Sequence, residues 1–561
     1  MFTGLVNVIT PVLIDGAGLT ELTAAMELSR LGAPVRLIGA PPGPSATSRT
    51  LVVHSLTAEL LEQRGLSPEA LPGSNRVRHT AVYTKGGLLG TAELAPDSDH
   101  RGYALLVRQA EMERALREQL ACQDVVAEYG TELAALVQDE PGWRGKPGGP
   151  GITALLRHPS GRQEEVAASC LISADGRQGT AGHLLNSPVH GGPEGPSYTL
   201  ADLWLDGDLR DDVISVFLGH RGFVMLLPAD GGRFQCIATG LPARSGDPGG
   251  SSQAELRKFI GGCLPRSVQL RQVRWSSRFP DTGRLSPPQR CGRVFFGGGS
   301  AHAYSPATGQ GVNSDIQDMI NLGWKLGMVL QGKAAPSLLD TYAEERIQVI
   351  RELEHRAEVP ADLLGPGSAL VRKLLTRVAP TLLDPHSLVD LCADLAGELI
   401  PDYWSSPLSA PPRGPGSLQP GGSVPDMRIF ASAPGTPAGS PPRAMRLHEL
   451  VSPSRLNLLL AGDAGPAAAP AAWLEQQLQP WRELMTVHLV TAAPGHEERF
   501  RRAFGGGQSL ILVRPDSHVC FAGRQKALPR LVTWLNTWFP LVPGSDHPVR
   551  RRQLAGWLHR A

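Results

Sequence analysis

Apolar positions at the start of the chain alternate between short continuous runs and helix-spaced stretches. The run at residues 11–14 ends at Asp15-Gly16-Ala17-Gly18, and residues 19–31 place leucine, alanine and methionine close to helical spacing. Gly32 ends this stretch, and residues 34–38 are again strand-like. This order predicts a β-α-β unit with a glycine-rich first turn, which is the usual setting of a dinucleotide-binding loop.

Farther along, the pattern changes to a region rich in strands and then back to mixed elements. Strand-like alternation with glycine turns dominates between Tyr198 and Ile237, and a strand at 292–297 precedes a helical stretch at 313–330. Pro, Gly and Ser crowd residues 405–442, which predicts a linker. We expect a nucleotide-binding domain in two parts, 1–187 and 287–404, the second part including a helical region. A β-rich domain at 188–286 lies between them, and the linker at 405–442 leads to a small α/β domain at 443–561.

The composition excludes several classes of function. Among 561 residues, 54 Lys and Arg stand against 53 Asp and Glu, so the chain lacks the charge excess of nucleic-acid binders and polybasic membrane binders. No apolar run of about 18 residues or more occurs, and residues 1–10 lack the basic start of a signal peptide. We therefore expect no nucleic-acid partner, no membrane span and a cytoplasmic location.

The cysteines give no sign of a metal site. They number seven, are widely spaced and never form a C-x-x-C pair. This arrangement predicts neither a zinc site nor a disulfide framework. We expect separate thiols in a reducing compartment, and we assign no metal ligand.

The glycine-rich turn departs from the dinucleotide-binding pattern at two places. In G-x-G-x-x-G the first glycine makes the tight turn, the second lets backbone N–H groups approach a pyrophosphate, and the third packs helix against strand. Gly16 and Gly18 fill the first two positions, but Glu21 fills the third and brings a negative charge toward the phosphates. Gly39 stands where an acidic residue would bind a ribose hydroxyl. From this region alone, a dinucleotide site and a β-α-β unit kept only for folding are equal alternatives.

Four blocks of sequence, taken together, resemble a known family. The first is the glycine turn followed by Ser48-Arg49-Thr50, and the second is residues 107–113, which include Gln109. The third is residues 172–177, with Asp175 before Gly176, and the fourth is residues 294–313, followed by Asp318, Asn321, Leu322, Trp324 and Lys325. In these blocks the chain resembles the aromatic-hydroxylase class of flavoprotein monooxygenases, the p-hydroxybenzoate hydroxylase-like family. It is most similar to the phenol- and polyketide-hydroxylase branch of that family.

The resemblance implies an α/β fold with a Rossmann-like FAD-binding domain, an inserted β-rich substrate domain and a C-terminal thioredoxin-like domain. It also implies FAD as cofactor, NAD(P)H and O2 as co-substrates, and hydroxylation of a small phenolic or polyketide-like aromatic, and it allows a homodimer. It indicates no catalytic residue. The cofactor-binding residues that it indicates are Gly16, Ala17, Gly18, Arg49, Gln109, Asp175, Gly299, Pro306, Gly309, Gly311, Val312 and Asn313.

Three substituted positions keep a second hypothesis open. Glu21 replaces a glycine of the family pattern, Gly39 an acidic residue, and Gly299 the aspartate that would bind the ribityl chain. The carboxylate–hydroxyl bonds lost at Gly39 and Gly299 would each contribute about 1.5–3 kcal/mol. The alternative is a degenerate flavoprotein fold that binds FAD weakly or not at all and serves as a scaffold or ligand-binding protein.

Other residues outside the glycine turns also receive interpretations. We interpret Trp324 and Lys325, on the long helical stretch, as packing and surface residues, and His302 as a structural hydrogen-bonding residue. Four apolar residues of the β-rich region are candidates to line a substrate pocket, although ordinary sheet core is the favoured interpretation of each one singly: Phe217, Phe223, Met225 and Leu227.

Overall fold

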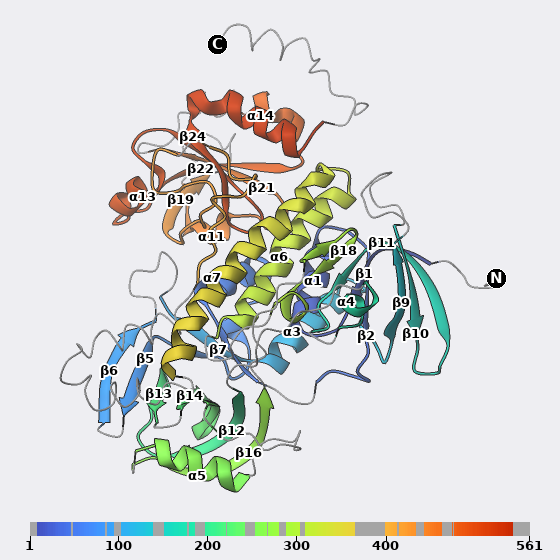
Figure 1. Cartoon of the computed structure of the whole chain (residues 1–561). Coiled ribbons are helices and arrows are strands. Elements are labelled where there is room, and N and C mark those ends of the chain that lie inside the picture. Colours follow the sequence, from blue (N-terminus) through green and yellow to red (C-terminus); the bar gives the residue numbers. More distant parts are fainter. Residues whose placement is uncertain are drawn as a thin grey trace. The chain divides into compact units, whose positions relative to one another are not determined.

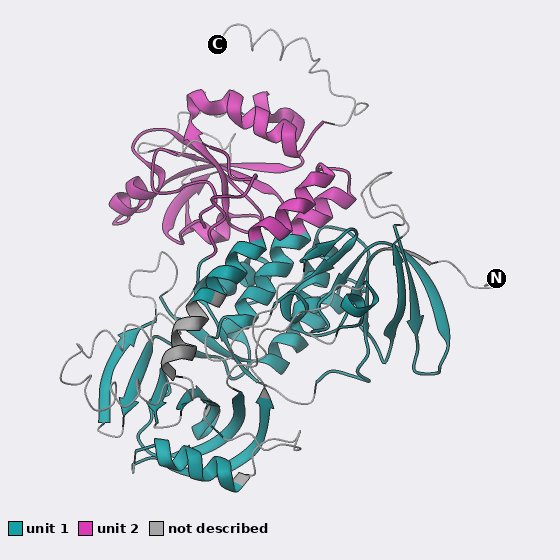
Figure 2. Ribbon diagram, viewed as in Figure 1, with its two compact units in different colours: residues 1–323, 346–400 teal, residues 324–345, 401–561 magenta. Residues whose placement is uncertain are grey.

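The computed structural model describes residues 8–45, 49–84, 87–94, 102–138, 151–176, 179–185, 197–219, 222–239, 241, 253–265, 267–279, 288–302, 309–364, 399–411, 414–432, 442–462, 474 and 476–541. The chain forms two compact units, shown in different colours in Figure 2. Unit 1 holds residues 1–323 and 346–400, and unit 2 holds residues 324–345 and 401–561.

The first sheet of unit 1 is centred on β1 (Val8–Asp15), whose residues Val12, Leu13 and Ile14 are fully buried. Helix α1 (Leu19–Arg30) follows, and β2 (Val35–Gly39) lies parallel to β1, so the predicted β-α-β unit is present. On the other side of β1 lie β11 (Gln163–Ser173) and then β18 (Val294–Phe296), also parallel (Figure 1). The carboxyl ends of these four strands therefore meet at one edge of the sheet, where nucleotides bind in open α/β folds. The other strands of this 8-stranded sheet are β8 (Glu128–Tyr129), β9 (Glu132–Gln138), β10 (Ile152–Arg157) and β17 (Arg290–Cys291).

The second sheet of unit 1 comes mainly from the predicted β-rich region. Its strands follow the order β16-β12-β15-β14-β13-β5-β6. One face of this sheet packs on α5 (Gln253–Cys263) and the other on a smaller sheet, so each face has its own apolar core. Strands β5 and β6 belong to this sheet although they come from residues 79–93, ahead of the region 188–286. Strand β5 joins the sheet by pairing in parallel with β13. The bounds are β5 (His79–Thr84), β6 (Gly87–Glu93), β12 (Tyr198–Asp206), β13 (Val213–Leu218), β14 (Phe223–Ala229), β15 (Arg233–Thr239) and β16 (Gln269–Phe279).

A 3-stranded sheet and several helices complete unit 1. The sheet joins β3 (Thr50–Val53), β7 (Ala104–Arg108) and β4 (Asn75–Val77). Helix α6 packs closely on α1 at Gly323, where an added Cβ would lie 2.5 Å from the Cβ of Glu27. None of the described helices is both long and apolar enough to cross a membrane. The helices are α2 (Ser55–Gln63), α3 (Gln109–Ala121), α4 (Thr180–Leu184), α6 (Gly311–Leu330) and α7 (Asp340–Leu364), with short 3-10 turns η1 (Pro68–Ala70), η2 (Asp230–Gly232) and η3 (Gly298–Ser300). Helices α6 and α7 each extend into unit 2.

Unit 2 is built on a 6-stranded sheet in the order β20-β19-β22-β21-β23-β24. Strands β21 and β22 are parallel, and the other described pairs are antiparallel, which gives β22-β21-β23-β24 the arrangement of a thioredoxin-like fold. The mixed α/β class predicted from the sequence is confirmed. The elements are β19 (Arg428–Ser432), β20 (Arg443–Arg446), α11 (Leu447–Leu450), β21 (Leu456–Ala461), β22 (Met485–Ala492), α13 (Glu497–Phe504), β23 (Ser509–Val513), β24 (Val519–Arg524) and α14 (Leu528–Trp538), with η5 (Pro336–Leu339), η7 (Gln479–Trp481) and η8 (Gln525–Ala527).

The stretch predicted as a linker, 405–442, carries structure in its described part. Strand β19 lies within it and pairs with β20 and β22. Leu418, Val424 and Met427 are buried in the core of unit 2. The Pro and Gly content predicted an extended chain, but a few apolar residues between them pack into the core, because their burial stabilises the unit.

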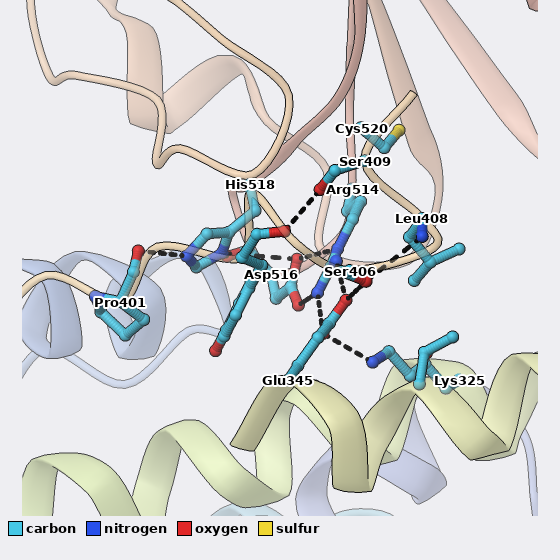
Figure 3. A network of polar contacts seen from close by, with 12 residues as sticks. Lys325, Glu345, Pro401, Ser406, Leu408, Ser409, Arg514, Asp516, His518 and Cys520 are labelled. Carbon is cyan, nitrogen blue, oxygen red and sulfur yellow. Dashed lines mark hydrogen bonds and ion pairs between the residues drawn. The ribbon is translucent and has the colours of Figure 1, made fainter. Parts of the chain in front are cut away.

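A network of buried charges lies inside unit 2 (Figure 3). Lys325 Nζ lies 2.7 Å from Glu345 Oε2, and both side chains are fully buried. Glu345 Oε1 also accepts hydrogen bonds from Arg514 Nη1 at 2.6 Å and from Ser406 Oγ at 2.6 Å. The prediction that Lys325 is a surface residue is therefore wrong. Its charge is compensated by a carboxylate on another helix, which the pattern of α6 alone does not reveal.

Candidate cofactor and substrate site

The glycine turn after β1 has the backbone geometry that its sequence predicts. Gly16 has a φ of +115°, a conformation that L side chains rarely adopt. Gly18 is the N-cap of α1, which places the first free N–H groups of that helix at the carboxyl edge of the sheet. A helix N-terminus carries partial positive charge, so this end of α1 favours an anion.

The Glu21 side chain already contacts this turn. Its Oε2 atom accepts a hydrogen bond from the Gly18 backbone N–H at 3.0 Å. A Cβ added at Gly16 would lie only 2.2 Å from Glu21 Oε1, so the carboxyl group lies directly over the turn. Burial raises the pKa of Glu21 to about 8, and the nearby carboxyl groups of Asp175 and Asp15 add to the rise.

Asp175 and Gly299 lie close to each other at the same edge. Asp175 Oδ1 accepts a hydrogen bond from Ser173 Oγ at 2.8 Å, and its Oδ2 accepts one from the Thr180 N–H at 2.8 Å. Ser300 Oγ accepts a hydrogen bond from the Gly176 N–H at 2.9 Å, which ties the turn after β18 to the turn after β11. A Cβ at Gly299 would lie 3.5 Å from the Gly176 Cα, an ordinary contact. The structure therefore brings together Gly16, Ala17, Gly18, Asp175 and Gly299.

The remaining described site residues gather around β3. The Gln109 N–H donates to the Arg49 carbonyl at 2.8 Å, and Gln109 Nε2 donates to Glu113 Oε1 at 2.7 Å. Gly309 has a φ of +63°, and a Cβ there would lie 3.3 Å from Val52 Cβ. Gly311, Val312 and Asn313 form the first turn of α6. Pro306 lies outside the described residues.

One contact region links these two groups of residues. A Cβ added at Gly298 would lie 3.1 Å from Thr20 Oγ1 on α1 and 3.3 Å from Asp315 Cγ on α6. The first turns of α1 and α6 therefore meet at the turn after β18. Asp318 Oδ2 accepts a hydrogen bond from the Gly298 N–H at 3.0 Å and lies 2.7 Å from His302 Nε2, so His302 makes the structural contact predicted for it.

The side chain of Asn313 holds the first turn of α6 against β3. Its Oδ1 accepts a hydrogen bond from the His54 N–H at 2.9 Å, and its Nδ2 lies 2.8 Å from the Val52 carbonyl and 3.0 Å from the Gly309 carbonyl. The family resemblance indicates Asn313 as a cofactor-binding residue. The structure shows in addition that its amide side chain fixes the first turn of α6.

The Asn313→Ala variant is expected to lose about 2–3 kcal/mol of unfolding free energy, because buried His54 and Val52 backbone groups lose their partner. Asn313→Asp is expected to lose a similar amount, since a carboxylate accepts from His54 but cannot donate to the two carbonyls. Denaturant unfolding measures both. Asn536→Ala, on the exposed face of α14, is the control and should change stability by less than about 0.5 kcal/mol. A loss at Asn313 no larger than the control's contradicts the assigned role.

The candidate substrate residues lie on two different faces of the second sheet. Phe223, Met225 and Leu227 share the core that faces the 3-stranded sheet. Phe217 pairs across the ladder with Val224 and belongs to the opposite core, where its ring stacks on Tyr83 at a centroid distance of 4.7 Å. All four side chains are therefore buried in apolar cores, as the sheet-core interpretation predicts, and the strand register turns Phe217 toward α5, away from the other three.

Gln235 is a residue that the sequence did not single out. From β15 its Oε1 accepts a hydrogen bond from the Thr50 N–H at 2.5 Å, and its Nε2 donates to the Thr50 carbonyl at 3.1 Å. This side chain joins the second sheet to the start of β3, next to Arg49. The two residues are 185 positions apart, and no local pattern indicates such a pair.

Comparison with known proteins assigns this fold and site to a class. Residues 9–357 match the family model described as FAD binding domain, and residues 420–540 match the model described as aromatic-ring hydroxylase, C-terminal. The chain is 32% identical to 6-methylpretetramide 4-monooxygenase from Streptomyces rimosus, over 96% of this chain and 95% of that protein. It is 28% identical to pentachlorophenol 4-monooxygenase from Sphingobium chlorophenolicum, over 91% and 93% of the two chains. The solved structure of the anhydrotetracycline hydroxylase OxyS from Streptomyces rimosus matches with a TM-score of 0.69 and 26% identity, over 95% and 99% of the two chains.

Both family models and a relative matched over nearly the whole chain point to the same class. The chain belongs to the FAD-dependent aromatic-ring hydroxylases. Its cofactor is FAD and its activity is that of an aromatic monooxygenase, as the family resemblance in the sequence implied. The alternative of a degenerate flavoprotein fold is not supported.

Proposed function

We propose that this enzyme hydroxylates a phenolic ring of a polycyclic, polyketide-like substrate, using NAD(P)H and O2. The observation that carries the proposal is the similarity to 6-methylpretetramide 4-monooxygenase, which is 32% identical over 96% of this chain. Pentachlorophenol 4-monooxygenase, matched over 91% of this chain, supports a phenolic ring as the site of hydroxylation.

The residues at the carboxyl edge of the first sheet fit a dinucleotide. The Oδ2 atom of Asp15 is buried there without a hydrogen-bond partner among the described residues, which leaves a polar atom for a ligand to contact. In the proposed site, Gly16, Ala17 and Gly18 hold the pyrophosphate, and Asp175 and Gly299 flank the chain that joins it to the flavin ring. Bound FAD supplies the redox chemistry that activates O2.

The other proposed site residues lie around the flavin ring. In the proposed site, Gly309, Gly311 and Val312 present backbone N–H groups to the flavin ring, at the positively polarised start of α6. Arg49 and Gln109 lie on the side of β3 that faces the ring in our proposal.

The test is turnover with a panel of tetracyclic and simple phenols. Purified protein should release FAD on denaturation, and a tetracyclic phenol should stimulate NAD(P)H oxidation and gain one oxygen atom from labelled O2, as seen by mass spectrometry. Reactions without substrate and with a non-aromatic ketone serve as controls. If the phenols of the panel stimulate NAD(P)H oxidation but none of them gains an oxygen atom, the result contradicts the proposed substrate class.

Two further proposals concern the cell and the assembly. We propose a cytoplasmic location, which is supported by the reduced thiols of Cys122, Cys170, Cys236, Cys291 and Cys520, as expected in a reducing compartment. The homodimer implied as an option by the family resemblance stays a prediction, and light scattering of the purified protein tests it.

A further inference from the structure

We propose that the Glu21 carboxyl group is a built-in occupant of the anion-binding end of α1, which the FAD pyrophosphate must displace to bind. The inference rests on the proposed placement of FAD at the turn after β1. It makes Glu21 a residue that sets the affinity for the cofactor, although it takes no part in the chemistry.

The geometry supplies the first argument. Glu21 Oε2 accepts the Gly18 N–H at 3.0 Å, and this N–H is among the donors that a G-x-G-x-x-G turn offers to a pyrophosphate. The side chain is 4% exposed and its second oxygen lies 2.2 Å from the position that a Cβ of Gly16 would take, so the carboxyl group fills the space over the turn that a phosphate would need. A glycine at position 21 would leave the same turn open.

The charges around Glu21 supply the second argument. Asp15 faces it from the end of β1 and Asp175 from the end of β11, and both are acidic. Asp315 on α6 lies beside Thr20, the neighbour of Glu21 on α1. Among the described residues, the side chains that shift the pKa of Glu21 are the acidic Asp175 and Asp15, and the contacts that lower this pKa come from backbone N–H groups. A bound pyrophosphate would add further negative charge, so it favours Glu21 in its neutral form or turned away from the site.

The direction of the pH effect follows from these neighbours. Burial, with Asp175 and Asp15, raises the pKa of Glu21 to about 8, so the group is mostly neutral at pH 7 and ionised at pH 9. The ionised form holds the Gly18 N–H more strongly and repels the pyrophosphate. FAD affinity should therefore fall as pH rises through 8. Burial, and next the charge of Asp175, also raise the pKa of Asp15, to about 7, and Asp15→Asn separates its contribution.

Two variants separate the effect of the Glu21 charge on FAD affinity from the effect of its side chain occupying the turn. Glu21→Gln keeps an oxygen that accepts the Gly18 N–H but carries no charge, and Glu21→Ala removes both. The matched control is Glu449→Gln, since Glu449 Oε2 accepts the Arg446 N–H at the start of α11 in the same way, within unit 2. Thermal unfolding checks that each variant is folded.

The experiment is a titration of the flavin-free full-length proteins with FAD, followed by flavin fluorescence, between pH 6.5 and 9.5. We expect the Kd of the wild-type and Glu449→Gln proteins to rise about tenfold from pH 7 to pH 9, since one proton changes affinity by at most tenfold per pH unit. Glu21→Gln should show a much flatter profile over the same range, with only the smaller contribution of Asp15 left, and Asp15→Asn should retain most of the wild-type slope. Glu21→Ala should bind FAD several-fold more tightly than wild type at pH 7.

The outcomes separate this proposal from the proposed function. A Glu21→Gln profile that follows the wild type, or a Glu21→Ala protein that binds FAD no better at pH 7, overturns the proposal alone. Absence of FAD binding by all these proteins at every pH overturns both the proposal and the placement of the cofactor.

Discussion

The Glu345→Ala variant is expected to lose about 3–5 kcal/mol of unfolding free energy, because it leaves two buried cations without their carboxylate. Glu345 lies between Lys325 Nζ, at 2.7 Å, and the guanidinium of Arg514, at 2.6 and 2.9 Å (Figure 3). Arg514 keeps Asp516 as a partner in the variant, but Lys325 loses the carboxylate that compensates its charge. The ammonium of Lys325 is fully buried, so water cannot replace that partner.

Guanidinium unfolding followed by tryptophan fluorescence measures this loss. Glu118→Ala is the matched control, since Glu118 pairs with Arg114 on an exposed helix face and its loss should cost less than about 1 kcal/mol. Equal losses of unfolding free energy for Glu345→Ala and Glu118→Ala would contradict a stabilising role of the buried network.

The same carboxylate predicts a dependence on pH. Burial alone would raise the pKa of Glu345, but the charges of Arg514 and Lys325 outweigh it and lower the pKa to about 2, from 4.5 in the unfolded chain. The contribution of Glu345 is therefore complete above pH 4.5 and is lost as pH falls toward 2. The stability gap between wild type and Glu345→Ala should accordingly narrow from pH 5 to pH 2.

The Asp318→Ala variant is expected to lose a comparable amount, about 3–5 kcal/mol, and to lose FAD as well. Asp318 Oδ1 lies 2.5 Å from the Nε of Arg346, which is fully buried, and its Oδ2 accepts the Gly298 N–H at 3.0 Å. Removing the carboxylate takes the acidic partner from Arg346, which keeps its hydrogen bonds to Ser314, and frees the turn that lies between the starts of α1 and α6. We therefore expect a lower free energy of unfolding for unit 1 and weaker binding of FAD.

Melting temperature and the FAD content of the purified protein measure the two effects. Asp212→Ala is the control, because Asp212 pairs with Arg210 at the surface and its removal should change stability by less than about 1 kcal/mol. Asp318→Asn should fall between wild type and Asp318→Ala, since the amide keeps an oxygen acceptor. An Asp318→Ala protein as stable as the control, with full FAD content, would contradict the role of this carboxylate.

The parts of the fold that the sequence predicted well are those with a local, periodic signal. The β-α-β unit at the start of the chain and the helix that begins near Asn313 follow directly from apolar spacing and glycine positions. The glycine turns were also informative, because a positive φ such as that of Gly16 restricts the residue type at one position. The cofactor edge of the first sheet could therefore be assembled from short segments.

The parts that were missed depend on partners far along the chain. Phe217 was placed with Phe223 because both are apolar residues of one region, but the register between their strands decides which face each side chain takes. Lys325 was assigned to the surface because its own helix gives no sign of Glu345, 20 residues later, or of Arg514. Whether a charged side chain is buried depends on the whole fold, so local periodicity does not predict it.

The double hydrogen bond between Gln235 and Thr50 has a consequence for engineering the enzyme. The amide of Gln235 reproduces one rung of a β-ladder with a side chain, donating to one backbone group and accepting from the other. Asparagine is too short to span the same gap, and glutamate would repel the Thr50 carbonyl. Designs that alter this sheet should therefore keep position 235 constant, so that the start of β3 stays in register with β15.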